Sequence, residues 1–192
     1  MQYLCCMKRI CLYILICLLA LSVSAQQRHS DAIDDVLEHT PMASVLILKA
    51  CGLDSRSESW EQLGFTAGVA YGIAGGTTLV LKHIIKKERP DHSDNYSFPS
   101  GHATFAFAGA HTLHKEFGRH SPWVSVAGYS VATFVAIDRV AKNRHRWYDV
   151  TTGAAIGVLG TELSYWLSDR VFKTDKVSVS VSPAGMDLAI RF

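Results

Sequence analysis

Beyond residue 25 the sequence holds one cysteine, Cys51, because the other four lie within the first 17 residues. An internal disulfide is therefore excluded in residues 26–192, and cysteine content says nothing about the redox compartment. None of the early cysteines follows the small-residue pattern of a lipid-modified cysteine, so we do not expect a lipoprotein. Charged residues are also scarce, at 19% against 48% hydrophobic residues, which favours contact with a membrane.

An excess of charge of either sign is missing as well. The chain has 19 basic and 17 acidic residues, and without Lys8 and Arg9 it has 17 of each. No nucleic-acid partner is expected, since domains that bind nucleic acid carry clustered positive charge. The length of 192 residues suits a single domain.

Residues 1–25 have the pattern of a secretory signal peptide. Lys8 and Arg9 precede an apolar run, and small residues then lead to Ala25. This pattern predicts export, with cleavage after Ala25. The alternative is an uncleaved first transmembrane helix, for which the run is short, since a span needs about 20 residues.

Long apolar segments with few charges predict helices. Residues 62–81 contain no charge, and four glycines recur there at every fourth position: Gly64, Gly68, Gly72 and Gly76. Such a stripe predicts close approach of a neighbouring helix. Three more apolar segments follow, at residues 103–113, 122–137 and 150–168. We expect an all-α, compact helical bundle with several membrane-embedded or membrane-associated helices.

The two flanks of this region have a different character. Residues 26–40 predict a short amphipathic helix on a surface, and residues 41–53 are apolar but too short to span a bilayer. After Lys176, apolar and polar residues alternate on both sides of a Ser-Pro-Ala-Gly turn, which predicts a C-terminal β-hairpin. The hairpin either closes the domain or pairs its edge with another chain. The expected division is a signal segment at 1–25, a main domain at 26–172 and a hairpin tail at 173–192.

Three polar blocks lie at the ends of the apolar segments. In the first, Lys82 and Arg89 are seven residues apart, almost two helical turns. Both side chains leave the same helical face if the helix extends that far. Taken alone, this block is better explained as the basic end of a membrane helix.

The second block is Pro99-Ser100-Gly101-His102, directly before residues 103–113. Backbone N–H groups of this turn and of the following helix form a site for an anion, and the Ser100 hydroxyl adds another donor. His102 then stands at the edge of an anion pocket. For a single histidine at a helix start, taken alone, helix capping or surface exposure is the more usual explanation.

The third block runs from Arg139 to Asp149. His145 and Asp149 are four residues apart, one helical turn, which predicts a hydrogen bond between the ring and the carboxylate. Arg139 lies six residues before His145, across a continuous helix, so we expect a break near Asn143. A solvated basic loop is the alternative for Lys142, Arg144 and Arg146.

Together the blocks offer three cations, a backbone anion site and two histidines, which fits phosphoryl transfer without a metal. Lys-x6-Arg-Pro, Pro-Ser-Gly-His and Arg-x5-His-x3-Asp occur in this order within roughly residues 60–170. They closely resemble the motifs of the type 2 phosphatidic acid phosphatase (PAP2) family, whose pocket is similar to that of vanadium haloperoxidases. The resemblance implies a PAP2-type helical bundle and a phosphatase, that is, a phosphoric monoester hydrolase.

The resemblance also implies roles for individual residues. His145 would attack phosphorus and form a phosphohistidine, Asp149 would fix the tautomer of His145, and His102 would protonate the leaving oxygen. The residues implied to bind the substrate phosphate are Lys82, Arg89, Ser100, Gly101 and Arg139. The family pattern implies no metal and no cofactor.

One position departs from the family pattern, which usually has serine before the arginine of the third block. Here that residue is Asp138. A carboxylate aimed at the substrate would repel phosphate, so we expect Asp138 to turn away or to pair with a nearby base.

Apolar helices around a cationic pocket suggest a phosphorylated membrane lipid as substrate. Phosphatidate, phosphatidylglycerol phosphate, undecaprenyl diphosphate and lipid A phosphate remain open. The expected location is the bacterial cell envelope, with the protein associated with the membrane and its active site facing the periplasm. The alternatives are a soluble periplasmic acid phosphatase and a vanadate-dependent haloperoxidase, although haloperoxidases are usually larger.

Two alternatives belong to a different functional class, a metal site and a binding module. His111 and His114 are three residues apart, but no carboxylate or cysteine joins them at convincing spacing, so we expect helix-surface histidines rather than a metal site. A binding module would keep the phosphate pocket without turnover.

Overall fold

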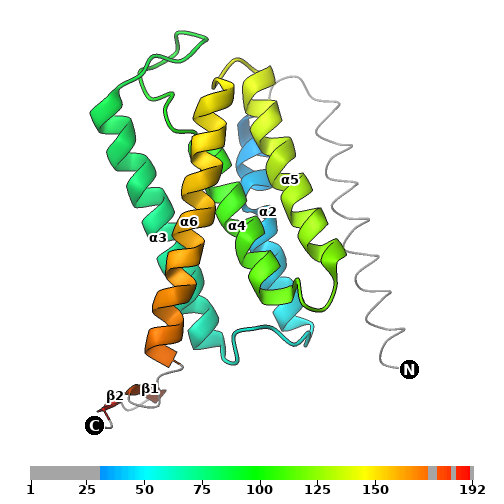
Figure 1. The fold of residues 1–192 in the computed structure, drawn as a ribbon, viewed down its shortest axis with the longest axis vertical. Helices are drawn as coiled ribbons and strands as arrows, with labels where there is room; N and C mark the ends of the chain where they lie inside the picture. The colour runs from blue at the N-terminus through cyan, green and yellow to red at the C-terminus, as the bar shows by residue number, and fades with distance from the viewer. Residues whose placement is uncertain (1–30, 173–176, 183–184, 191–192) are drawn as a thin grey trace.

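The computed structural model describes residues 31–172, 177–182 and 185–190. Its described part is a bundle of helices, shown in chain order in Figure 1: α2 (Asp31–Ala50), α3 (Trp60–Ile85), α4 (Gly101–Phe117), α5 (Pro122–Ala141) and α6 (Trp147–Phe172). The prediction of a helical bundle is confirmed for this part of the chain. The predicted signal segment, residues 1–25, lies outside the described residues.

Helix α4 lies at the centre of the bundle and packs against α2, α3, α5 and α6. Its buried face is built mainly from small residues: Ala103, Ala106, Ala108, Gly109 and Ala110. Helix α6 approaches it at Gly153 and Gly157, where an added Cβ atom would collide with the Ser100 and Thr104 carbonyl oxygens. Any side chain at these two glycines would push the helices apart.

The glycine stripe of α3 does not form a helix contact in the described structure. A Cβ atom added at any of these four glycines would meet nothing within 4 Å: Gly64, Gly68, Gly72 and Gly76. The prediction of packing along the stripe is wrong, because α3 buries a different face that includes Leu63, Ala70 and Ala74. The close approach occurs instead at Gly160 of α6, whose added Cβ would lie 3.3 Å from Ala74.

Helix α2 is longer and more buried than the sequence indicates. The acidic segment and the apolar segment form one helix of 20 residues that contains Pro41 and packs against α4 and α5. Leu37, Val45 and Leu48 are almost fully buried on its inner face. The prediction of a short surface helix is therefore wrong, because α2 is one of the packed helices of the bundle.

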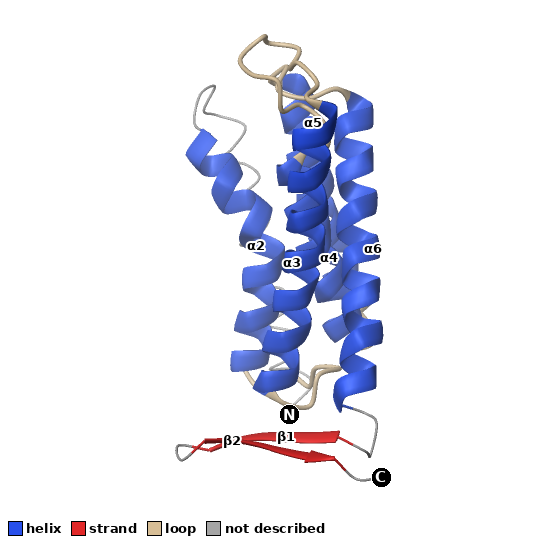
Figure 2. Cartoon of the chain, turned by 90° about the vertical axis from the view of Figure 1, so that its left-hand side faces the viewer, coloured by secondary structure: helices blue, strands red, loops and turns tan. Residues whose placement is uncertain are grey.

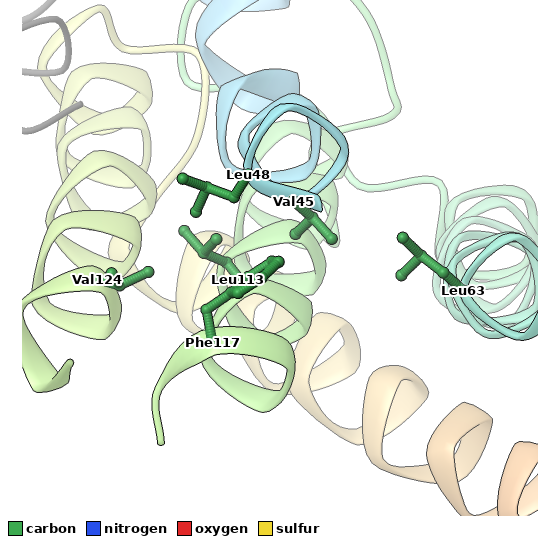
Figure 3. Packing of buried hydrophobic residues seen from close by; sticks show 6 residues of the cluster. All are labelled: Val45, Leu48, Leu63, Leu113, Phe117 and Val124. Carbon is green, nitrogen blue, oxygen red and sulfur yellow. The ribbon is translucent and has the colours of Figure 1, made fainter. Parts of the chain in front are cut away.

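The largest apolar cluster lies toward the C-terminal end of α4. Figure 3 shows its members, which come from four helices: Val45, Leu48, Leu63, Leu113, Phe117 and Val124. Beside it, the buried carboxylate of Glu116 accepts hydrogen bonds from the backbone N–H and hydroxyl of Ser57 and from the hydroxyl of Tyr165. These contacts fasten the α2–α3 loop to this end of the bundle.

The opposite end of the bundle carries the polar blocks. The loop from α3 to α4 and the loop from α5 to α6 lie at the same end in Figure 1, and α4 begins there. All three sequence blocks therefore meet at one end of the bundle.

Beyond α6 the chain forms β1 (Val177–Ser182) and β2 (Gly185–Ile190), which pair antiparallel with Val177 opposite Ile190 (Figure 2). Residues 183–184, at the expected turn, lie outside the described residues. The closing hairpin stays a prediction, and the fold rests on the helices alone.

Two helices of the described part, α3 and α5, are long and apolar enough to cross a membrane. Large apolar side chains that are more than half exposed lie on α3, α5 and α6: Leu79, Val80, Ile84, Ile137 and Leu159. Apolar side chains gathered on the surface are typical of a protein that contacts lipid.

Candidate active site

The chain changes direction between Lys82 and Arg89, the two cations of the first block, because α3 ends there. Helix α3 stops at Ile85, and Lys86 adopts a left-handed conformation with φ of 46°. Lys82 is therefore on the helix, whereas Arg89 is in the following loop. The condition for a shared helical face is not met, because the helix does not extend to Arg89.

Folding of the α3–α4 loop, rather than a common helical face, positions the two cations. Lys82 Nζ donates to the carbonyl oxygen of Tyr96 over 2.6 Å. Arg89 Nε donates to Asp94 Oδ1 over 2.8 Å, and the Arg89 backbone N–H donates to the Asp94 carbonyl. The loop thus folds back over the end of α3.

Ser100 is the N-cap of α4, and its Oγ accepts from the backbone N–H of Ala103. The turn also lies against α6, because the Ser100 N–H donates to the carbonyl oxygen of Asp149 over 3.0 Å. Ser100 is fully buried. Its hydroxyl hydrogen is not used by the cap, so Ser100 keeps a donor beside the N-terminus of α4.

His145 lies in the loop between α5 and α6, before the first residue of α6. Helix α5 ends at Ala141, and Asn143 has a positive φ of 55°, so the predicted break near Asn143 is confirmed. His145 Nδ1 lies 2.7 Å from the carbonyl oxygen of Ser97. A carbonyl only accepts, so Nδ1 carries the hydrogen, and Nε2 of the neutral ring keeps its lone pair.

Asp149 does not touch the His145 ring. Its carboxylate accepts from Lys87 Nζ (2.6 Å), Ser97 Oγ (2.7 Å) and the Arg146 backbone N–H (2.9 Å). The predicted direct hydrogen bond is wrong, because His145 precedes α6 and helical spacing does not apply to it. Asp149 instead reaches the ring through Ser97, whose hydroxyl it holds and whose carbonyl bonds His145.

The charges around His145 favour its neutral form. Burial lowers the pKa of His145 to about 3, helped by the positive charges of Arg89, Lys82 and Arg139 and opposed by the Ser97 carbonyl. For Asp149, burial alone would raise the pKa, but the hydrogen bonds from Lys87, Arg146 and Ser97 outweigh it and the pKa is lowered. At neutral pH the site therefore contains a neutral imidazole and an ionised carboxylate.

Arg139 is almost fully buried and points toward α2. Its Nη1 donates to Asp34 Oδ2 over 2.7 Å, and Lys142 Nζ contacts the same carboxylate at 2.8 Å. Burial would raise the pKa of Asp34, yet Lys142 and Arg139 lower it overall. Asp138 pairs with Lys142 over 2.8 Å, which confirms the expectation that Asp138 pairs with a nearby base.

His102 also faces α2. Its Nε2 lies 2.9 Å from Asp35 Oδ1, and its Nδ1 lies 3.7 Å from Glu38 Oε2. Burial and the charge of Arg139 lower the pKa of His102, against the opposing effect of Asp35. The charge of Arg139 thus contributes to the lowered pKa of both His102 and His145.

The structure thus brings the predicted site residues to one end of the bundle, and their roles remain predictions. Sequence reasoning missed the partners that hold them: Asp34, Asp35, Glu38, Lys87 and Ser97. The sequence did hold a signal for Asp34, Asp35 and Glu38. Their spacing of i, i+1 and i+4 places the three carboxylates on one side of a helix.

Two groups of residues in the described part of the chain contain histidine together with carboxylates. Ligand atoms of Asp35, Glu38 and His102 lie within 4.8 Å of one another, but the histidine turns a different nitrogen to each carboxylate, so we assign no metal there. His111 is buried and contacts Glu162 Oε1 through Nε2 at 2.6 Å. It is therefore not the surface histidine that we expected.

An apolar groove opens beside the site between α4, α5 and α6. It has a volume of about 490 Å³, and its lining residues are apolar apart from two threonine hydroxyls and the indole N–H of Trp147. The groove is lined by Phe107, Thr133, Ala136, Ile137, Val140, Ala141, Trp147, Val150, Thr151 and Ala154. Two of the lining residues directly follow candidate site residues along the chain: Val140 follows Arg139, and Val150 follows Asp149.

The chain is similar to known proteins in sequence and in fold. The family model of the PAP2 superfamily matches residues 63–173. The chain is 41% identical over 141 residues to lipid A 1-phosphatase of Porphyromonas gingivalis, covering 73% of this chain and 32% of that protein. It is 31% identical over 120 residues to decaprenylphosphoryl-5-phosphoribose phosphatase of Mycobacterium tuberculosis, covering 58% of this chain and 62% of that protein.

The chain therefore spans about a third of the first relative's length and less than two thirds of the second's. Among solved structures, the crystal structure of LpxE from Aquifex aeolicus has a TM-score of 0.52. It is 19% identical, and the match covers 72% of this chain and 88% of that one. This likeness concerns the fold alone.

Proposed function

The chain belongs to the PAP2 superfamily, and on that premise we propose that it is a phosphatase that removes a phosphate group from a membrane lipid. The observation that carries the proposal is the state of His145. The ring is buried and neutral, its Nδ1–H is held by the Ser97 carbonyl, and the charges of Lys82 and Arg89 act on it. A nucleophile for phosphorus needs this free lone pair close to cations that bind the phosphate oxygens.

In the first step, His145 Nε2 attacks phosphorus. A nitrogen–phosphorus bond forms, the bond to the ester oxygen breaks, and His102 gives that oxygen a proton. The phosphate oxygens would be bound by the proposed donors: Lys82, Arg89, Arg139, the Ser100 hydroxyl and the Gly101 N–H. Stabilising charge that develops on these oxygens is the largest expected contribution to the rate.

In the second step, water attacks the phosphohistidine. His102 accepts a proton from the water, the nitrogen–phosphorus bond breaks, and phosphate leaves with His145 neutral again. Asp149 has an indirect part, because it fixes Ser97 and the Ser97 carbonyl fixes the tautomer of His145. Neither step requires a metal ion.

The apolar groove supports a lipid substrate rather than a small soluble phosphate. When a lipid places its phosphate among the cations, its apolar part can contact the apolar groove nearby. The exposed apolar side chains of α3 and α5 support membrane association. We place the site on the periplasmic side of a bacterial envelope membrane, with phosphatidate, phosphatidylglycerol phosphate, undecaprenyl diphosphate and lipid A phosphate as candidate substrates.

Filling the groove is expected to weaken lipid hydrolysis selectively. In Ala154→Trp, the ratio of kcat/KM for a long-chain lipid phosphate to that for p-nitrophenyl phosphate should fall about tenfold, since each methylene kept from apolar contact costs about 0.8 kcal/mol. Phosphate release from detergent-dispersed lipids measures this ratio.

Leu159→Trp is the matched control, because Leu159 lies on the same helix, exposed and outside the groove. Its ratio should equal that of the unmodified protein. Equal ratios in all three proteins would exclude the groove as the lipid subsite, and absence of phosphate release from every lipid would overturn the proposed function.

A further inference from the structure

The first turns of α2 turn three acidic side chains toward the site. Asp34 pairs with Arg139, Asp35 contacts His102 Nε2 and Glu38 lies near His102 Nδ1. Both ring nitrogens of His102 therefore face carboxylates from one helix. None of these acidic residues belongs to the three sequence blocks.

Resting on the proposed function, we propose that Glu38 and Asp35 are positioning residues that supply and orient the proton that His102 delivers to the leaving oxygen. Asp35 accepts from His102 Nε2, so it fixes a tautomer in which Nε2 carries a hydrogen and Nδ1 has a lone pair. The Nδ1 atom faces Glu38 Oε2 across 3.7 Å. A protonated Glu38 would thus face a nitrogen that accepts.

The surroundings of Glu38 favour its protonated form near neutral pH. The residue is only 8% exposed, and its Oε2 has no hydrogen-bond partner among the described residues. Burial raises the pKa of Glu38 to about 7, with smaller raising effects from Asp35 and Asp34 and an opposing effect from Arg139.

Groups from every neighbouring helix face this carboxyl. On α2 itself, His39 Nε2 lies 3.1 Å from Glu38 Oε1, and the two aspartates lie nearby. Helix α4 contributes His102, α5 contributes Arg139, and α3 contributes Tyr71, whose hydroxyl interacts with the Glu38 charge. The result is a buried acid that ionises in the same pH range as a histidine.

Two protons move in the first chemical step, one from His102 and one from Glu38. The Nε2–H bond of His102 breaks as its proton passes to the leaving oxygen, which replaces Asp35 as the acceptor. The O–H bond of Glu38 breaks as its proton passes to Nδ1, once the two atoms approach to about 2.9 Å. Water returns one proton in the second step, and the Glu38–His102 pair regains its starting charge.

The proton shared by Glu38 and His102 makes the rate depend on pH. Turnover needs one proton on the Glu38–His102 pair, so the rate falls as pH rises through the pKa of the pair. Replacing Glu38 by glutamine removes both the proton store and a negative charge that favours the imidazolium. The alkaline limb of the rate profile must therefore move to lower pH.

The test compares pH–rate profiles of kcat for the unmodified protein, Glu38→Gln and Asp35→Asn. The substrates are a phosphatidate dispersed in detergent, whose alkoxide needs a proton to leave, and p-nitrophenyl phosphate, whose phenoxide does not. In Glu38→Gln, we expect the phosphatidate rate at pH 7 to fall about tenfold to a hundredfold more than the p-nitrophenyl phosphate rate. This is less than the full contribution of a general acid, about 10²–10⁴-fold, because His102 itself remains. Asp35→Asn should shift the profile in the same direction by less.

Glu162→Gln is the matched control, because it removes a carboxylate from another histidine, His111, outside the site. Its profile should match the unmodified protein. Equal losses on both substrates, or an unmoved alkaline limb in Glu38→Gln, would overturn the proton supply by α2. If Glu38→Gln does not fold, the Asp35→Asn variant provides the test, because Asp35 is exposed. An Asp35→Asn pH–rate profile that is not shifted would overturn the proton supply by α2. An unmodified protein that hydrolyses neither substrate would instead overturn the proposed function.

Discussion

His145→Ala is expected to abolish hydrolysis of both lipid phosphates and p-nitrophenyl phosphate. The variant loses the atom that bonds phosphorus in the proposed mechanism. Loss of the nucleophile alone costs about 10⁶-fold in a well-studied hydrolase, so a drop of at least about 10⁴-fold is expected here. Initial rates of phosphate release measure it, with bound phosphate as a check that the pocket persists.

His120→Ala is a suitable control, since His120 is exposed in the α4–α5 loop at the other end of the bundle. It should keep the full rate. A His145→Ala protein that hydrolyses either substrate as fast as the control would remove His145 from the mechanism. Removing the ring also deletes its bond to the Ser97 carbonyl, so thermal unfolding should be compared in parallel.

His102→Ala is expected to give a loss that depends on the leaving group. For an alkyl phosphate the rate should fall about 10²–10⁴-fold, the usual contribution of a general acid. For p-nitrophenyl phosphate the loss should be much smaller, because p-nitrophenoxide leaves without a proton. A series of aryl phosphates with increasing leaving-group pKa measures this difference.

The slope of rate against leaving-group pKa should be steeper in His102→Ala than in the unmodified protein. Parallel slopes would mean that His102 does not protonate the leaving oxygen. The contact between His102 and Asp35 would then be only a structural ion pair between α2 and α4.

The sequence predicted the parts of the site that depend on residue type. Three cations and two histidines lie near the ends of apolar segments: Lys82, Arg89, Arg139, His102 and His145. The helices bring these segment ends to one end of the bundle. The break near Asn143 was predictable because a continuous helix would place Arg139 and His145 on different sides.

The parts that depend on tertiary contacts were not predictable. Helical spacing suggested that Asp149 holds His145, but α6 begins only at Trp147, and Ser97 from the α3–α4 loop takes that place. A loop residue 48 positions away leaves no periodic signal in the sequence. The same holds for Lys87, whose ammonium meets Asp149 only after the loop folds back.

Periodicity alone also misjudged two helices. In α3 the glycine stripe and the apolar face lie on different sides, and the packing of Leu63 and Ala74 decided which side is buried. In α2 the acidic positions looked solvated, yet Asp34 is buried because it pairs with Arg139 of α5 and with Lys142, which directly follows α5. Buried charge is stable when paired, and the pairing partner is 105 residues away.

Trapping of the covalent intermediate tests the central claim most directly. Unmodified protein is mixed with a lipid phosphate labelled at phosphorus, quenched in alkali, where phosphohistidine persists, and digested for mass spectrometry. We expect the label on the peptide that contains His145 and none in the His145→Ala protein. Label on any other residue, or turnover by His145→Ala without label, would contradict the account.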